Sequence, residues 1–378
     1  MDFRKITYNH LLFFLFIPVV VTAKILRWTV MKASLADDGI GYHYIKDICE
    51  KTSDFLIWET SRIDVATHNA IYIYRLFNWL DCRTYSEFEI AITITFNIVL
   101  LMLLIDFSLR NRHITKSQFF FLLFFIGVMN VYTFTLSKEP IQMLYFILVY
   151  IVLRTDKSAN SKWGLIIGII LLIVITTRTY FILMLMFTLI IRYSISTITK
   201  MVNNRFWETF ICFFLMFGIV YFCFLSVCEV MKPDEFAELI RVRTRESEAV
   251  TDMRNILPTT NLVMFVLDYL IMVLRMLFPI ELLRFGLKYG IFVIYQVLIS
   301  WMMLKTLREY SMNTRTKNIA VTLYWGFLFC SATFEPDFGS WVRHESVTIP
   351  FMLFVLESKG KGYIDAKKKC NIRAFVYK

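Results

Sequence analysis

Long apolar stretches separated by short basic loops are the feature that most constrains this chain. Of its 378 residues, 57% are hydrophobic, and these residues are concentrated in continuous blocks. A water-soluble domain does not carry apolar sequence in this form. The blocks cover 10–28, 88–106, 118–136, 141–153, 164–177, 180–196, 207–228, 262–283, 285–304, 319–333 and 346–357. The sequence therefore predicts an all-α, polytopic transmembrane helical bundle.

Five clusters of Lys and Arg predict how the chain crosses the membrane. They are Arg110/Arg112/Lys116, Arg154/Lys157/Lys162, Arg192/Lys200/Arg205, Lys305/Arg308/Arg315/Lys317 and the basic tail 358–378. Because positive loops stay in the cytoplasm, we expect all five clusters and both termini on that side. Basic loops that contact anionic lipid headgroups also account for the net charge of +11, and a nucleic-acid partner is excluded.

The number of crossings follows from the same clusters. Three apolar blocks lie between the third and fourth clusters, although the chain has to cross an even number of times to return to the cytoplasm. The block 262–283 carries Asp268, Arg275 and Glu281, and charges at membrane depth are costly. We therefore predict that this block is re-entrant or interfacial, which leaves about ten spans.

We expect a single integral membrane domain over 1–378, with long outer loops at 27–87 and 229–284. In the first loop, Ile73, Phe77 and Leu80 recur at helical spacing, which predicts an amphipathic helix lying on the membrane surface. Cys49 and Cys82 share this loop and could form a disulfide or remain thiols.

Asp37 and Asp38 follow the first apolar block directly. Two adjacent carboxylates at a membrane surface could chelate a divalent cation such as Mg²⁺ or Mn²⁺, or one of them could take a proton from an attacking hydroxyl. Because Gly39 comes next, the dipeptide taken alone favours an ordinary Asp-Gly turn.

Charged residues in three further outer segments are candidates for binding an anionic substrate. Lys138 could hold a phosphate that Glu139 orients, or the two could form a surface ion pair. Arg178 interrupts two apolar blocks, where it needs an anionic partner or has to reach water. Arg241 begins an alternating run of arginines that could form an anion-binding strip or a solvated charged helix.

The outer segment 334–345 is the densest candidate site in the chain. Arg343 suits a phosphate or carboxylate through paired hydrogen bonds, and His344 titrates near neutral pH. Glu335 and Asp337 could accept sugar hydroxyls, and Trp341 offers a ring on which a sugar could stack or which could anchor the loop in the interface. Ionisable groups beside a membrane bundle mark a functional site.

The layout resembles known membrane enzymes. Asp37-Asp38 after the first span is similar to the acidic motif of GT-C type membrane glycosyltransferases. The stretch from Asp337 to His344, which runs into Pro350 and the last span, resembles the late loop of Wzy-like bacterial repeat-unit polymerases. Motifs typical of soluble enzymes, such as a phosphate-binding Gly-rich loop or a zinc-binding H-E-x-x-H, do not occur in the sequence.

The resemblance implies an enzyme of the bacterial inner membrane that assembles O-antigen, capsule or exopolysaccharide for the cell envelope. Its substrates would be sugars or oligosaccharides linked to a polyprenyl phosphate or diphosphate, and its partners would be membrane lipids, a flippase and chain-length or export proteins. Asp37, Asp38 and His344 would be catalytic, while Lys138, Glu139, Arg178, Arg241, Glu335, Asp337, Trp341 and Arg343 would bind substrate. The alternatives are a flippase for lipid-linked oligosaccharides and a non-catalytic scaffold of the export machinery.

Overall fold

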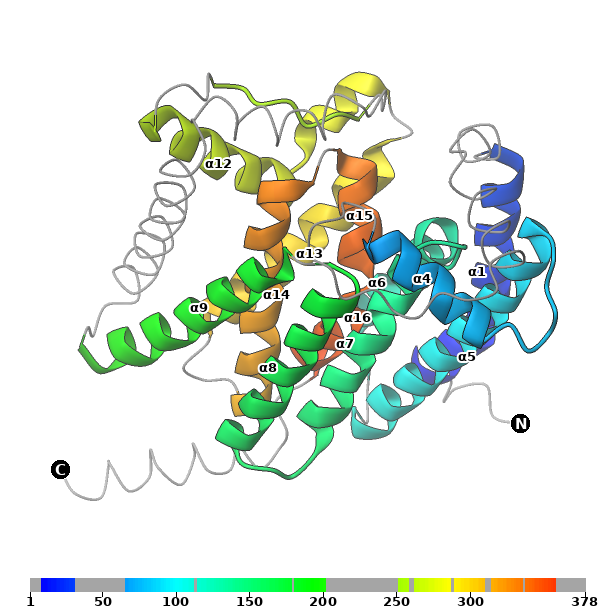
Figure 1. The fold of residues 1–378 in the computed structure, drawn as a ribbon, viewed down its shortest axis with the longest axis horizontal. Coiled ribbons are helices and arrows are strands. Elements are labelled where there is room, and N and C mark those ends of the chain that lie inside the picture. Colours follow the sequence, from blue (N-terminus) through cyan, green and yellow to red (C-terminus); the bar gives the residue numbers. More distant parts are fainter. Residues whose placement is uncertain are drawn as a thin grey trace.

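The computed structural model describes residues 8–30, 65–111, 114–178, 180–201, 251–257, 262–286, 289–309, 314–335 and 337–357. Nearly all of these residues lie in helices, and the described ranges contain no β-strand (Figure 1). The expected all-α class is therefore confirmed. Asp37, Asp38, Arg241 and Cys49 lie outside the described residues, so the predictions made for them remain predictions.

The helices follow the apolar blocks of the sequence. They are α1 (Tyr8–Val30), α4 (Val65–Leu76), α5 (Tyr85–Arg110), α6 (Lys116–Val128), the π-helical turn η2 (Met129–Thr133), α7 (Glu139–Arg154), α8 (Ala159–Thr176), α9 (Phe181–Met201), α12 (Leu262–Leu277), the 3-10 helix η3 (Ile280–Phe285), α13 (Gly290–Arg308), α14 (Arg315–Phe334), α15 (Phe338–Ser346) and α16 (Ile349–Leu356). α4 ends at Leu76, so Phe77 and Leu80 follow the helix instead of extending it, and the predicted surface helix is shorter than its spacing suggested.

Within the described ranges, five helices are long and apolar enough to cross a membrane: α1, α5, α6 with η2, α8 and α13. The 18 residues of α8 are about 27 Å long, close to the thickness of a hydrocarbon core of about 30 Å. These helices support a membrane protein. The figure of about ten spans remains a prediction.

Helix α5 shows how the bundle faces its surroundings. Its buried side carries residues such as Phe96 and Leu103, whereas Ile94, Ile98 and Met102 are more than half exposed. A continuous exposed apolar stripe of this kind is unfavourable in water and suits contact with lipid chains. The composition of α5 therefore reflects two apolar environments, the bundle core and the membrane.

Helices α9 and α14 cross closely at Gly326. A Cβ atom at this position would overlap Oγ1 of Thr188 and come within 3.0 Å of the carbonyl oxygen of Met184 and the nitrogen of Thr188. The missing side chain thus lets the two backbones approach. This crossing matters for the site described below, because Arg178 precedes α9 and Glu335 follows α14.

The charges of block 262–283 are paired in the fold. Asp268 accepts hydrogen bonds from the backbone nitrogens of Ile256 (2.7 Å) and Leu257 (2.9 Å). Arg275 makes two hydrogen bonds to Glu281, at 2.6 and 2.9 Å. The helix α12 is only 16 residues long, and Pro279 follows its end. A re-entrant or interfacial position remains a prediction, and the pairing lowers the cost of these charges at either place.

Basic residues from several helix ends meet at one end of the bundle. Arg154 contacts both Asp106 (2.9 Å) and Glu357 (2.5 Å), and Asp106 also pairs with Arg110. Lys162 donates to the carbonyl of Leu153 at 2.8 Å. The loop between α7 and α8 and the last turn of α5 lie at the lower edge of Figure 1. Residues from different predicted cytoplasmic clusters therefore share one end, and the opposite ends of α7, α8 and α14 carry the candidate site.

Candidate functional site

The start of α7 brings Glu139 into the site, and a buried ionic group holds the preceding turn. Lys24 donates to the carbonyl oxygen of Phe134 at 2.6 Å, and Arg27 donates to that of Val131 at 2.7 Å. Both cations also contact Glu89, at 3.4 and 2.5 Å. Carbonyls at the end of a helical segment lack partners within the helix, so cations placed there fix where the chain turns.

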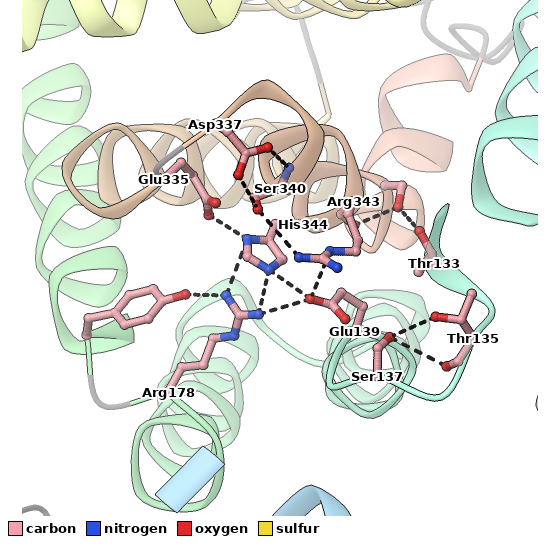
Figure 2. A network of polar contacts seen from close by, with 12 residues as sticks. Thr133, Thr135, Ser137, Glu139, Arg178, Glu335, Asp337, Ser340, Arg343 and His344 are labelled. Carbon is pink, nitrogen blue, oxygen red and sulfur yellow. Dashed lines mark hydrogen bonds and ion pairs between the residues drawn. The ribbon is translucent and has the colours of Figure 1, made fainter. Parts of the chain in front are cut away.

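The end of α8 delivers Arg178. The hydroxyl of Thr177 donates to the carbonyl of Ile173 at 2.9 Å, and the backbone nitrogen of Arg178 donates to the same carbonyl at 3.0 Å. From the neighbouring α4, the side chain of Asn69 donates to the carbonyl of Thr176 at 2.7 Å. These bonds end the helix at one position and send the side chain of Arg178 across the bundle toward α15 (Figure 2).

The turn between α14 and α15 supplies the remaining charges. Glu335 is the residue that caps the C-terminus of α14. Asp337 caps the N-terminus of α15, where its carboxylate accepts from the backbone nitrogen (2.8 Å) and the hydroxyl (2.9 Å) of Ser340. Helix α15 then presents Arg343 and His344 to the other two segments. The sequence forms this short helix because Asp337 satisfies its first free N–H groups.

Five ionisable side chains meet at this point, and we call them the charge cluster: Glu139, Arg178, Glu335, Arg343 and His344. Nδ1 of His344 lies 2.6 Å from Glu335, and Nε2 lies 2.8 Å from Glu139. Arg178 lies 2.7 Å from Nε2 of His344 and 3.3 Å from Glu139. Arg343 lies 3.5 Å from the same oxygen of Glu139. The cluster thus joins segments that are up to 205 positions apart in sequence.

The two contacts of Nε2 of His344 have opposite hydrogen-bonding requirements. Arg178 can only donate, so its 2.7 Å contact needs Nε2 to accept, whereas Glu139 at 2.8 Å needs Nε2 to carry a proton. A neutral ring that donates from Nδ1 to Glu335 satisfies the first contact, and a charged ring satisfies the second. The ring is thus held between a donor and an acceptor, which makes His344 a candidate for a general acid or base.

The formal charge of the cluster depends on this one ring. Two arginines balance two carboxylates, so the cluster is neutral or carries a single positive charge. Burial raises the pKa of Glu139, the first residue of α7, but Arg343, His344 and Arg178 together outweigh burial and hold that pKa well below its usual range. Glu139 therefore stays ionised beside the two arginines.

The cluster is closed except on one side. The side chains of Glu139, Arg178, Glu335 and His344 are at most 11% exposed, whereas that of Arg343 is 34% exposed. A ligand that approached from solvent would therefore meet the guanidinium of Arg343 first. One oxygen of Glu335, Oε2, is buried and has no hydrogen-bond partner.

The predicted site residues divide into those in the cluster and those outside it. Lys138 is half-buried and directly precedes Glu139 at the start of α7. Asp337 serves as a helix cap next to the cluster. Trp341 is fully buried and stacks on Phe327, with ring centroids 5.9 Å apart. The role expected for Trp341, stacking on a sugar, does not fit this geometry because neither ring face is exposed.

Sequence reasoning missed two buried polar groups. One is the group of Lys24, Arg27 and Glu89. In the sequence, the features that could have indicated it are two basic residues near the end of one apolar block and an acidic residue inside the next block. The other contains Glu345, which is fully buried and accepts from Tyr324 at 2.5 Å and Gln296 at 2.9 Å. Neither group has a spacing that predicts contact, since their members come from different helices.

Comparison with known proteins adds no family. The chain matches no protein-family model, no curated protein and no solved structure. Among the residues that the structure describes, no group of three or more His, Cys, Asp or Glu side chains could hold a metal ion. The divalent cation predicted at Asp37 and Asp38 lies outside these residues.

Proposed function

We propose that this chain is a membrane glycosyltransferase or polymerase that joins sugars linked to a polyprenyl phosphate or diphosphate. The reaction takes place on the outer face of the bacterial inner membrane, during assembly of a surface polysaccharide. Both termini lie in the cytoplasm, and the charge cluster lies on the opposite side.

The charge cluster is the observation that supports this proposal. Its five residues come from three segments that the positions of the basic loops predict to be outer segments. They lie at the ends of α7, α8 and α14 that are distant from Arg154 and Lys162, which are on the basic end. A set of buried acids, bases and arginines at one end of a membrane bundle is costly to maintain without a function.

The chemistry of the cluster suits a sugar donor with a phosphate leaving group. The oxygen of an acceptor hydroxyl attacks the anomeric carbon, the bond from that carbon to the phosphate oxygen breaks, and polyprenyl phosphate or diphosphate leaves with the bonding electrons. Arg343 and Arg178, with Lys138 beside them, neutralise the charge that develops on the phosphate. The leaving group is stable, so the protein mainly has to position the reactants.

The acceptor proton goes to His344 or to Asp38. His344 has the geometry of a base, since Glu335 orients its ring at Nδ1 in the way that a carboxylate orients a catalytic histidine. The unpartnered Oε2 of Glu335 is an acceptor for a sugar hydroxyl. Asp337 is less suited to that role because both of its oxygens already bind Ser340.

Deletion of the gene, followed by analysis of surface glycan and lipid-linked intermediates, tests the function. Accumulation of single repeat units on the outer face indicates a polymerase, and loss of one sugar from each unit indicates a single-sugar transferase. Normal glycan and normal intermediates in the deletion strain would refute the proposal.

An Arg343→Ala variant tests the site. We expect it to abolish polymer, or reduce it strongly, because the exposed cation of the cluster is lost. Arg254→Ala is the matched control, since that side chain is 87% exposed and its ion-pair partner among the described residues is Asp252, outside the charge cluster. Full-length polymer in the Arg343→Ala strain, at normal protein level, would remove the cluster from the mechanism.

A flippase is the second candidate, and buried polar side chains inside the bundle favour it. Asn97 and Asn130 form a pair of hydrogen bonds at 2.7 and 3.0 Å between α5 and η2. Glu345, Tyr324 and Gln296 form a second polar group between α13, α14 and α15. Polar residues along a path through the spans are expected of a transporter. In a flippase deletion, complete repeat units would remain on the cytoplasmic face.

A further inference from the structure

The connection between α4 and α5 exposes an unusual run of apolar side chains. Leu76 is 54% exposed, Phe77 60%, Trp79 82% and Leu80 76%. Residues 76–80 are called the apolar loop below. The rings of Phe77 and Trp79 contact each other, with centroids 5.7 Å apart, and do not turn into the core. Four large apolar residues exposed together mark a surface that contacts another apolar phase.

The position of this loop is set by the opposite face of α4. Asn69 holds the carbonyl of Thr176, two residues before Arg178. Tyr74 donates its hydroxyl to the carbonyl of Ser137 at 2.6 Å, two residues before Glu139. The helix is therefore attached to both backbone segments that carry the charge cluster, and the apolar loop lies at the same end of the bundle as that cluster.

The neighbouring residues indicate a lipid surface as the partner. After Leu80 the chain reaches an exposed ion pair of Asp81 and Arg83, each side chain 75% exposed. Helix α5 starts at Tyr85 and is a candidate span, and the exposed apolar side of α5 begins at Ile90. Figure 1 shows the connection beside the N-terminal half of α5, at the edge of the molecule. The apolar loop and the stripe on α5 thus border the same side.

We propose that the apolar loop inserts into the outer leaflet at the boundary between headgroups and acyl chains, and that it anchors α4 and the backbone of the charge cluster to the membrane surface. Trp and Phe are the residues that favour this boundary, and Leu is inserted with them. Asp81 and Arg83 remain among the headgroups. This inference does not depend on glycosyl transfer, since it concerns only the bilayer.

Fluorine NMR on the full chain in nanodiscs tests the position of Trp79. The protein is labelled with 5-fluorotryptophan, and the resonance that disappears in Trp79→Phe is assigned to Trp79. We expect a nitroxide attached near the headgroup of the lipid to broaden this resonance strongly, and a water-soluble paramagnetic chelate to broaden it weakly. Trp325, which is 5% exposed and is assigned through Trp325→Phe, should respond to neither reagent.

Two outcomes would overturn the proposal. Strong broadening by the aqueous chelate with little effect of the lipid nitroxide would place the loop in water. Broadening by neither reagent would mean that protein covers Trp79, either a second copy of this chain or another subunit. The assignment variants are conservative, and an unchanged unfolding temperature in Trp79→Phe shows that the comparison is made on folded protein.

Discussion

Gly326→Ala perturbs the crossing of α9 and α14 with a single methyl group. The added Cβ would overlap the hydroxyl of Thr188, which a change of rotamer could move aside. It would also lie 3.0 Å from two backbone atoms, the carbonyl oxygen of Met184 and the nitrogen of Thr188. Backbone atoms cannot rotate away, so the two helices have to separate by a few tenths of an ångström, as a rough figure for relieving such a contact.

The expected cost follows from two opposing terms. Overpacking of a buried contact costs about 1–3 kcal/mol. Replacing Gly by Ala inside a helix returns up to about 1 kcal/mol through helix propensity. With the full helix-propensity gain subtracted, the net loss of unfolding free energy is about 0–2 kcal/mol. The separation also moves Arg178 away from Glu335 and His344, so we expect a loss of site activity beyond the loss of stability.

Gly168→Ala is the matched control, because Gly168 lies inside α8 and no heavy atom lies within 4 Å of a Cβ built there. This variant should be unchanged or more stable by up to about 1 kcal/mol. Unfolding of both variants in detergent micelles, followed by circular dichroism against increasing denaturant, measures the difference. If Gly326→Ala proved at least as stable as Gly168→Ala, the close crossing would not exist and the reasoning would fail.

Two further predictions concern the buried polar groups. Glu89→Gln leaves Lys24 and Arg27 buried without a counter-charge, so we expect a loss of about 3–5 kcal/mol of unfolding free energy in the same assay. The control Asp81→Asn changes an exposed side chain and should cost less than about 0.5 kcal/mol. Equal losses in the two variants would contradict the buried pairing. Glu345→Gln should leave the unfolding free energy unchanged or raise it. The described hydrogen-bond partners of Glu345, Tyr324 and Gln296, are neutral, and an amide avoids the cost of burying a charge. A loss of several kcal/mol, roughly that of breaking an ion pair, would show that the carboxylate charge is needed.

The sequence predicted most helices because their length and apolar content are local properties. The block 141–153 lies within α7, and the block 164–177 nearly coincides with α8. The block 285–304 shows where this reasoning stops. Gly286 has a φ of 121°, which only glycine adopts readily, so η3 ends there and α13 starts at Gly290. The apolar content of a block does not reveal such a change in the direction of the chain.

The sequence allowed us to predict which segments form the site, but not how their side chains are arranged. Placing the outer loops on one side grouped Glu139, Arg178 and His344, and the fold brings them into contact. The role of Trp341 did not follow, because 334–345 was treated as a loop. In the helix α15, residues 341 and 345 lie one turn apart on the same buried face, whereas Arg343 lies about 200° away from Trp341.

Two successive side chains of helix α15 contact different partners. His344 contacts the arginines and carboxylates of the charge cluster, and Glu345 contacts Tyr324 and Gln296. A turn of this helix by one position, about 100°, would place Glu345 where His344 lies and His344 where Arg343 lies. An acid would then face Glu139 and Glu335. The helix consequently has one rotational setting that pairs its charges, so any motion of α15 has to move the helix as a whole without rotating it about its axis.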